Sequence, residues 1–347
     1  VNYSSGTYTR TDSGTSNSFA ITGDYGMLNG YNLKISEKII MTPFALGSGK
    51  ETDPYQIRNV QELVSFKNYI NNIYSGAGQY FKLTMDSTTP SHSSDGITYD
   101  LSDTTQNPDV NWNVAIGIST SNLQGNVDGN GKQISNINIT KIADNDNVSG
   151  FFGHVSGCSI KNLKVSGTID ASSVNQDGTT DTLKTYGKDS YVGLLAGDAN
   201  SANIHNITVD YNITMRILHY LPSTEPNSFK TGCGGAVGQI SGTSSITNVL
   251  GTGTLNGISS KTETRPIQFG GIIGWVNHKD ANSTIEIDNC ISDASINTST
   301  TVNTYMQSNN GGIIGNVTGN LSSNTNVVNC ASYGTFNTLS GNTGGIL

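Results

Sequence analysis

Charged residues are scarce in this chain of 347 residues, and their scarcity argues against several kinds of partner. Only 13% of the residues are Asp, Glu, Lys or Arg, the formal net charge is −8, and arginine occurs four times. Nucleic-acid binding needs clusters of basic residues, and tight recognition of acidic polysaccharides uses arginine in bidentate pairs. The sequence therefore predicts a protein that binds no nucleic acid and is poorly suited to acidic polysaccharides.

Long apolar segments are also missing from the chain. No apolar run approaches the length that a membrane-spanning helix needs, so we expect no membrane span in this chain. The chain begins at Val1 without a methionine and stops inside a repeat at Leu347. We therefore expect a processed or excised piece, with any signal peptide or anchor outside it.

Glycine recurs in a fixed phrase. The phrase reads Gly-apolar-apolar-Gly, and its copies begin 33 to 43 residues apart, a spacing typical of repeat proteins. The copies are Gly150–Gly153, Gly193–Ala196, Gly235–Gly238, Gly271–Gly274 and Gly312–Gly315, with a sixth copy cut short after Gly345. In the second copy, Ala196 stands where the closing glycine is expected.

Asparagine recurs in a second phrase that follows each copy of the first. These asparagines are Asn162, Asn206, Asn248, Asn289 and Asn329. From two residues before the Asn to seven after it, all five copies share one frame, whereas the distance from the first Gly to the Asn ranges from 12 to 18 residues. A frame that holds in short pieces and slips between them indicates short strands in fixed register joined by surface loops.

The apolar residues around each Asn alternate as in a β-strand, with one slip of phase at the Asn. Such a slip predicts a bend where the chain passes from one sheet to the next. If each repeat forms one coil, the five Asn lie above one another in a buried ladder of side-chain amides. The sequence thus predicts an all-β protein, a single-stranded right-handed parallel β-helix (β-solenoid) with one coil per repeat, its handedness following the general rule for parallel crossovers.

The four cysteines, Cys158, Cys233, Cys290 and Cys330, are too few for a disulfide scaffold and lack the spacing of a metal site. Cys290 and Cys330 occupy the same position in consecutive repeats, so we expect them to stack about 4.8 Å apart. That separation falls within the range of a disulfide, although parallel Cβ vectors make the bond awkward. We expect two stacked core thiols, with a disulfide as the alternative.

The two repeated phrases, together with the upstream segments Gly49–Ile57 and Val127–Asn136, resemble the GLUG-motif repeats of large bacterial surface and adhesin-like proteins. The resemblance covers about residues 45–347, is clearest from residue 125 onward, and departs from the pattern at Ala196. It implies a β-helical fold and an extracellular or bacterial cell-surface location. It supplies no catalytic residues.

The N-terminal part of the chain departs from the repeats. Residues 1–44 match no repeat, and we interpret them as an N-terminal extension or cap over the open end of the β-helix that spans residues 45–347. One short helix is predicted near 59–72, because Asn59 can cap it and Leu63, Phe66, Tyr69 and Ile70 share one face. Residues 86–110, rich in Ser, Thr, Asp and Pro, are expected to form a long surface loop.

Candidate metal ligands are few. Asp144 and Asp146 supply alternate carboxylates and are weak candidates for binding Ca²⁺, although a solvated loop is the expected structure there. Asp128-Gly129-Asn130-Gly131 lacks the alternating oxygen ligands of a calcium loop, and a tight turn explains it. We therefore expect no cofactor, with Ca²⁺ as a minor alternative.

Catalytic residues are not expected either. Parallel β-helix enzymes that cleave polysaccharides need carboxylates side by side on consecutive coils. The positions five residues after each Asn, where such a stack would be sought, hold small or aromatic residues instead. They are Gly167, Tyr211, Gly253, Ala294 and Gly334.

The sequence favours a non-enzymatic β-solenoid that is secreted or displayed on the cell surface and acts as an adhesin, stalk or assembly module. Its expected partners are a glycan, a host or cell-surface protein, or further copies and modules of the same assembly. One alternative is a polysaccharide-active β-helix enzyme, either a hydrolase or a lyase. Another is a self-assembling extracellular filament subunit.

Overall fold

The computed structural model describes residues 2–4, 7–9, 19–20, 43–85, 96–107, 111–140, 148–170, 190–217, 231–259, 267–300, 308–338 and 342–347. The chain divides into two compact units, Val1–Met41 and Thr42–Leu347, a boundary three residues before the one expected from the sequence. In the first unit, β1 (Asn2–Ser4), β2 (Thr7–Thr9) and β3 (Phe19–Ala20) form a small antiparallel sheet. The role of this unit as a cap stays a prediction.

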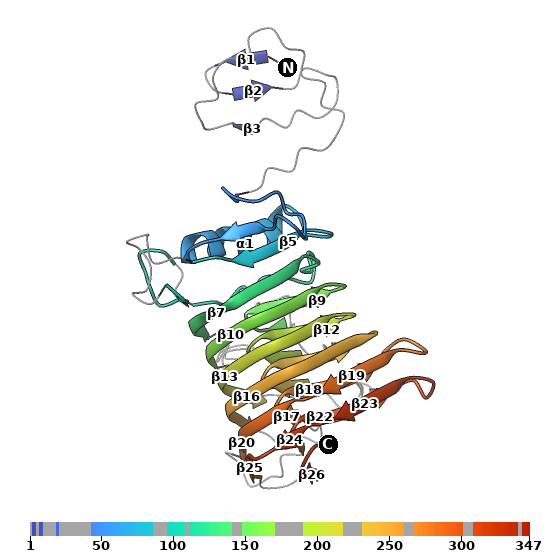
Figure 1. Ribbon diagram of the computed structural model, residues 1–347. Coiled ribbons are helices and arrows are strands. Elements are labelled where there is room, and N and C mark those ends of the chain that lie inside the picture. The colour runs from blue at the N-terminus through green and yellow to red at the C-terminus, as the bar shows by residue number, and fades with distance from the viewer. Residues whose placement is uncertain are drawn as a thin grey trace, which may run out of the picture. The chain divides into compact units, whose positions relative to one another are not determined.

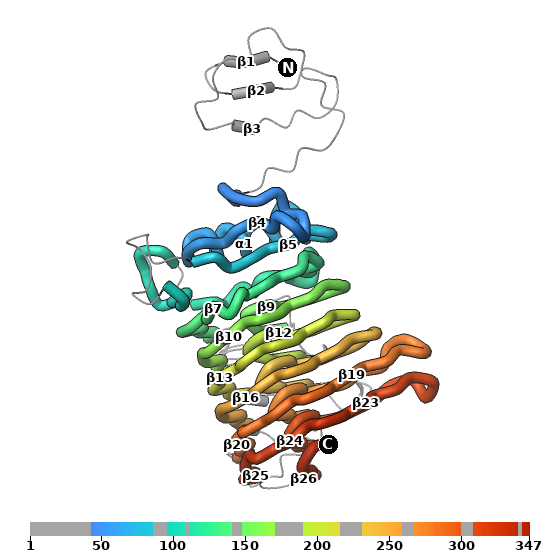
Figure 2. Tube along the Cα trace, in the orientation of Figure 1, coloured from blue at the N-terminus to red at the C-terminus, as the bar shows by residue number. Residues whose placement is uncertain are grey.

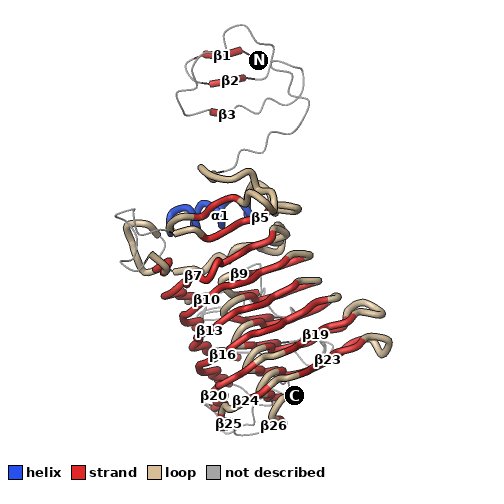
Figure 3. Tube along the Cα trace, viewed as in Figure 1, coloured by secondary structure: helices blue, strands red, loops and turns tan. Residues whose placement is uncertain are grey.

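In the second unit, parallel strands form three sheets (Figures 1 and 3). Sheet 1 contains β4 (Tyr55–Ile57), β5 (Tyr80–Leu83), β6 (Thr98–Asp100), β7 (Asn126–Ile139), β10 (Ser159–Asp170), β13 (Asn203–Ile217), β16 (Ser244–Ser259), β19 (Thr284–Asp288), β20 (Ile291–Thr300), β23 (Asn324–Val328), β24 (Ala331–Ser332) and β25 (Thr335–Asn337). Sheet 2 contains β8 (Val148–Ser149), β11 (Ser190–Gly193), β14 (Thr231–Gly234), β17 (Ile267–Gly270), β21 (Ser308–Gly311) and β26 (Asn342–Gly344). Sheet 3 contains β9 (Phe152–Ser156), β12 (Ala196–Asn200), β15 (Val237–Ser241), β18 (Ile273–His278) and β22 (Ile314–Gly319).

Each repeat forms one coil that passes through sheet 2, sheet 3 and sheet 1 in turn. We number them coil 1 (148–170), coil 2 (190–217), coil 3 (231–259), coil 4 (267–300) and coil 5 (308–338). Successive coils pair in parallel, so that Ile204 pairs with Ile160 on one side and with Ile246 on the other. Figure 2 shows the coils stacked in chain order. The predicted right-handed parallel β-helix with one coil per repeat is confirmed.

The helix α1 (Val60–Asn72) is confirmed at the predicted place. The Asn59 side chain accepts a hydrogen bond from the backbone N–H of Glu62 at 2.7 Å, which satisfies one of the free donors of the first turn. The predicted face is buried, because Leu63, Phe66, Tyr69 and Ile70 are each at most 1% exposed. The helix packs this face against the first strands of sheet 1 and belongs to the fold of the second unit.

The expected surface loop over residues 86–110 is wrong in part. Residues 96–107 include β6, which pairs with β7, and the side chains of Tyr99 and Leu101 are fully buried. The Tyr99 hydroxyl donates to the Ile57 carbonyl and accepts from the Met85 N–H at 3.0 Å. The free energy gained by burying these two side chains, with the Tyr99 hydroxyl fully hydrogen-bonded, holds this segment in the fold although its composition is polar. Residues 86–95 and 108–110 lie outside the described residues.

The structure also corrects the frame of the glycine phrase. Gly193 pairs with Gly234 rather than with Gly235, and Ala196 pairs with Val237 at an apolar position. The closing glycine of the second copy is therefore present, one residue later, at Gly197. The apparent departure at Ala196 arose because the phrase is five residues long, Gly-x-apolar-apolar-Gly, in every coil from coil 2 to coil 5.

Close backbone contacts explain both glycines of this phrase. A Cβ on Gly270 would lie 1.8 Å from the carbonyl oxygen of Ile273, because the chain folds back over three residues between sheets 2 and 3. A Cβ on Gly274 would lie 2.3 Å from the backbone nitrogen of Cys233, in the sheet 2 strand of the preceding coil. The two sheets therefore pack backbone against backbone, and any side chain at these positions would separate them.

Candidate binding face

The five repeated Asn occupy the left-handed region of backbone conformation. Their φ angles lie between 52° and 56°, a region that Asn enters more readily than most residues. The left-handed residue shifts the phase of the strand, so that the Asn side chain points outward while Ile160 and Leu163, on either side of Asn162, both point into the core. The predicted bend is present, but it lies within sheet 1 rather than between two sheets.

The Asn side chains form a ladder across the coils. Asn206 donates to Asn162 at 3.0 Å, Asn248 donates to Asn206 at 3.0 Å, and Asn289 donates to Asn248 at 2.6 Å. Aspartates accept from the other two donors of the column, because Asn162 donates to Asp128 at 3.0 Å, and Asn329 donates to Asp288 at 2.9 Å rather than to Asn289. The prediction of a buried ladder is wrong, because Asn162 is partly exposed and the other four Asn are exposed. At each bend the apolar residues on either side of the Asn point into the core, so the Asn side chain points outward.

Beyond the Asn ladder, the outward residues of sheet 1 form a polar surface that we call the polar face. Its columns align by strand pairing, one residue from each coil. One column contains Ser166, Asp210, Thr252 and Asp293, and the next contains Thr168, Asn212, Thr254, Ser295 and Thr335. Hydrogen bonds join neighbouring coils within this surface, as between Asn297 and Asn256 at 3.1 Å. The polar face is therefore a stiff array of hydroxyl, amide and carboxylate groups.

On the other side of the ladder, the corner between sheets 3 and 1 changes length along the stack. The chain needs nine residues from Gly197 to Asn206 in coil 2 but fifteen from Gly274 to Asn289 in coil 4. Coils 1 to 3 turn on one left-handed residue, which is Ser201 in coil 2. Coils 4 and 5 instead carry the arcs 279–283 and 320–323, which we call the long arcs and which extend past the end of β16 in Figure 2.

Buried hydrogen bonds hold the long arcs in place. The two ring nitrogens of His278 lie 2.8 Å from Ser283 Oγ and 2.7 Å from Thr325 Oγ1. Ser283 Oγ also lies 3.1 Å from Ser323 Oγ, which joins one arc to the next. Burial lowers the pKa of His278, so the neutral imidazole donates from one nitrogen and accepts at the other.

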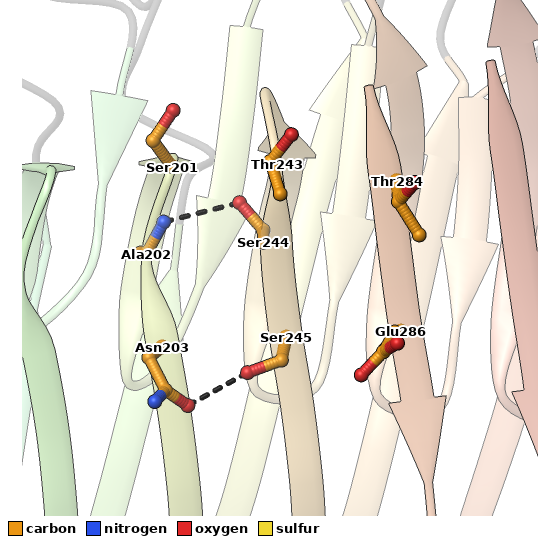
Figure 4. Close-up of a pocket in the computed structure, with 8 residues that line it drawn as sticks. All are labelled: Ser201, Ala202, Asn203, Thr243, Ser244, Ser245, Thr284 and Glu286. Atoms are coloured by element: carbon orange, nitrogen blue, oxygen red, sulfur yellow. Dashed lines mark hydrogen bonds between the residues drawn. The ribbon is translucent and has the colours of Figure 1, made fainter. Parts of the chain in front are cut away.

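An open groove of about 290 Å³ lies at this step between the short and long corners (Figure 4). It is lined by Ser201, Ala202, Asn203, Thr243, Ser244, Ser245, Thr284 and Glu286. Asn203, Ser245 and Glu286 form one row across three consecutive strands. Ser245 Oγ donates to Asn203 Oδ1 at 2.7 Å, and Ser244 Oγ accepts from the Ala202 N–H at 3.1 Å.

A second polar cluster lies on sheet 3. Asp198 accepts from Gln239 at 2.8 Å and lies 3.3 Å from His154 Nδ1, and Asn277 donates to Gln239 at 2.9 Å. Burial acts to raise the pKa of Asp198, but hydrogen bonds from His154 and Gln239 and the positive charge of Lys279 outweigh it and lower that pKa. The cluster therefore holds an ionised carboxylate within a row of amides, which stabilises the stack of coils 1 to 4.

The four cysteines carry free thiols. Cys290 and Cys330 lie on neighbouring strands, since the Ala331 N–H donates to the Cys290 carbonyl at 3.0 Å. Burial raises the pKa of Cys290 to about 12, so this thiol stays protonated at neutral pH. The expected pair of core thiols is half right, because Cys330, in the last coil, is partly exposed.

The candidate calcium ligands Asp144 and Asp146 lie outside the described residues. Within the described ranges, no three or more His, Cys, Asp or Glu side chains gather closely enough to hold a metal ion. In that same part of the chain, no helix has both the length and the apolar character needed to cross a membrane.

Sequence reasoning missed the groove and the two aspartates that accept hydrogen bonds from Asn162 and Asn329. The jump in the distance from the first Gly to the Asn, from 13 residues in the third repeat to 18 in the fourth, is the signal that marks the step. No comparable signal in the sequence marks Asp128 and Asp288, because an aspartate near a repeated Asn cannot be told apart by sequence from an aspartate that only contacts solvent.

The chain matches no protein-family model and no curated protein. Among solved structures, it is similar to a crystal structure from Bacteroides ovatus that is provisionally described as an immunoglobulin A1 protease. The two chains are 16% identical, the match covers 86% of this chain and 85% of the other, and the TM-score is 0.45. Likeness at this level carries no argument about function, and the fold assignment rests on the strand pairing described above.

Proposed function

We propose that this protein is a non-enzymatic β-helical module, secreted or displayed on a bacterial cell surface, that acts as an adhesin or stalk. It binds a glycan or a protein partner through the polar face and the corners beside it. The observation that carries the proposal is the polar face, where hydroxyl and amide groups from coils 1 to 5 stand in aligned columns.

Preorganisation favours binding at such a surface. Side chains of the polar face and the ladder are held by hydrogen bonds to their neighbours, such as Asn297 to Asn256, and the strands beneath them are paired on both sides. A partner that binds there loses less free energy to ordering side chains than it would at a mobile surface. Repetition along the stack also allows several weak contacts to act together.

The arrangement of acidic residues supports a binding role over a catalytic one. Asp210 and Asp293 share a column of the polar face, but Thr252 stands between them and all three lie on an open sheet surface. Hydrolysis of a glycan by two carboxylates needs both to flank one bond in a site that holds the sugar. The resemblance to GLUG-motif repeats adds support for a location outside the cell.

Binding of the intact chain to arrays of glycans and of host and cell-surface proteins tests the proposal, alongside a screen for polysaccharide degradation. We expect saturable binding without degradation. Thr252→Arg in the middle of the polar face should weaken binding about tenfold or more by steric and electrostatic interference, whereas Asn68→Arg on the exposed side of α1 should not change it.

Several outcomes would overturn the proposal. Release of reducing ends or unsaturated sugars from a polysaccharide would favour the enzyme alternative. End-to-end association of the chain into fibres, with no binding on either array, would favour the filament alternative.

A further inference from the structure

We infer that the groove at the step between coils 3 and 4 is a binding site for a neutral, hydroxyl-rich saccharide that lies across coils 2 to 4. The inference rests on the proposed binding function and assigns a ligand class to one place on the molecule. Its central residues are Asn203, Ser245 and Glu286, which project side by side from three paired strands (Figure 4).

The walls of the groove are built before any ligand arrives. On one side, the short corner of coil 3 is closed by Ser244, whose Oγ donates to the Ser241 carbonyl at 2.7 Å and accepts from the Ala202 N–H. On the other side, the long arc of coil 4 is held by His278 and Ser283. Because both corners are fixed by buried hydrogen bonds, the step between them does not close by itself.

The row of three residues offers hydrogen-bonding groups of different kinds. Asn203 uses its side-chain oxygen to accept from Ser245, which leaves its two amide hydrogens as donors. The Glu286 carboxylate is exposed and has no hydrogen-bond partner among the described residues, so it presents acceptors only. Neighbouring strands lie about 4.8 Å apart, and the row therefore presents donors at Asn203 and acceptors at Ser245 and Glu286 over the length of about two sugar residues.

Sugar hydroxyls fit such a row because each one both donates and accepts a hydrogen bond. A phosphate or an acidic sugar fits poorly, since Glu286 would repel it and the groove lining contains no Lys or Arg. One carboxylate is also too few for Ca²⁺, which takes six to eight oxygen ligands. A peptide cannot add as a strand, because β16 is already paired with β13 and β19.

The test is a titration of the full chain with cellohexaose, maltohexaose and mannohexaose, followed by NMR or calorimetry, with a hexamer of galacturonic acid as the acidic comparison. We expect at least one neutral hexasaccharide to bind and the acidic one to bind at least tenfold more weakly. Glu286→Gln keeps the shape of the side chain and removes its charge, and it should weaken binding about tenfold. Asn203→Ala should weaken it severalfold.

Glu51→Gln is the matched control, because it makes the same exchange at an exposed carboxylate that lies before β4, outside both the polar face and the groove. It should leave saccharide binding unchanged. Since Asn203, Glu286 and Glu51 are exposed, all three variants should unfold at the temperature of the parent chain, so loss of binding is not confused with loss of folding.

The outcomes separate this inference from the function it rests on. Binding that resists Glu286→Gln and Asn203→Ala but is lost in the Thr252→Arg variant would overturn the groove site and leave the proposed function standing. If the chain binds a protein partner but none of the saccharides, the groove site is likewise overturned and the proposed function stands. Absence of both saccharide and protein binding would overturn the two together.

Discussion

Coils 2 and 3 differ from coils 4 and 5 at the corner between sheets 3 and 1 and are alike almost everywhere else. The column of Asn, the glycine phrase and the apolar columns continue through all four coils in register. The corner alone changes, from a turn on Ser201 or Gly242 to the long arcs 279–283 and 320–323.

The comparison shows where a stacked fold tolerates change. An inward residue contacts its counterparts in the coils above and below, so a change of length there would shift every strand that follows. A corner that projects into solvent has fewer neighbours to satisfy and can lengthen by several residues. The groove is the place where two corner lengths meet.

The largest effects should come from the glycine phrase, which both kinds of coil share. Gly234→Ala in coil 3 and Gly270→Ala in coil 4 would each place a Cβ less than 2 Å from a carbonyl oxygen. Each should lower the free energy of unfolding by about 3 kcal/mol or more, measured by chemical denaturation. Gly345→Ala serves as the control, because its Cβ would meet no atom within 4 Å. A large loss of stability in one coil with a small loss in the other would show that the two coils differ at the glycine phrase.

Substitutions at the Asn bend of sheet 1 should change the free energy of unfolding by a smaller amount, which differs between the two kinds of coil. Asn248 donates to Asn206 and accepts from Asn289, whereas Asn289 makes only the bond to Asn248 within the ladder. Asn248→Ala should cost about 2 kcal/mol, partly because alanine is strained at this φ, and Asn289→Ala should cost somewhat less because it breaks one bond rather than two.

Glycine substitutions separate the two contributions at these corners. Asn248→Gly and Asn289→Gly remove the ladder bonds but relieve the strained backbone, so each should be more stable than the alanine variant in denaturant unfolding. Equal stability of the Gly and Ala variants would show that alanine is not strained at the positive φ of the Asn bend.

A buried serine closes each kind of corner and allows a more local comparison. Ser244 bonds the Ser241 carbonyl and the Ala202 N–H, while Ser283 Oγ donates to the Asp280 carbonyl within the long arc and also contacts His278. Ser283→Ala should cost about 1.5 kcal/mol and Ser244→Ala about 1 kcal/mol, because each leaves buried polar groups without a partner. Amide hydrogen exchange should speed up at the mutated corner alone, and faster exchange throughout both coils would argue against a local role.

The smallest expected effect depends on pH and belongs to the long arcs. Burial lowers the pKa of His278 below its ordinary value of about 6.5, so protonation favours the opened arc. The stabilisation is complete above about pH 6.5 and decreases as the pH falls from that value toward the lower pKa of the folded state. The protection of the amides of 279–283, which is the intrinsic exchange rate at each pH divided by the observed rate, should therefore be lower at pH 5.5 than at pH 7.5.

His278→Gln should remove this pH dependence from the long arc. The pKa of His205 is also lowered, by burial and by Lys161. Its protonation at low pH therefore destabilises coil 2, so exchange must be compared peptide by peptide. A pH dependence over 279–283 that persists in His278→Gln would assign it to another group.

Sequence reasoning located the fold and the column of Asn because both arise from periodic patterns. A repeating frame around Asn162 to Asn329 leaves little choice other than stacked parallel strands, and the Asn59 cap with its apolar face predicts α1. The same reasoning placed the ladder in the core, because alternation alone does not reveal that a left-handed residue turns its own side chain outward. It also assigned Gly193 the wrong counterpart, since glycine doublets in later coils offer two equally good frames.

Tyr99 and the groove were missed for a different reason. Burial of Tyr99 depends on contacts with Ile57 and Met85, which lie far away along the chain and follow no repeat. The row of Asn203, Ser245 and Glu286 becomes a site only when three coils are stacked and one corner is longer than the next.

The sequence by itself determined that this chain forms coils, how long each coil is, and which apolar residues of each repeat point inward, because these depend on the order of apolar and polar residues within one repeat. Only the tertiary structure decided which polar groups meet on the surface and where the surface is hollowed. Those outcomes depend on the register between coils and on the difference in length between neighbouring corners, and neither is a property of any single repeat.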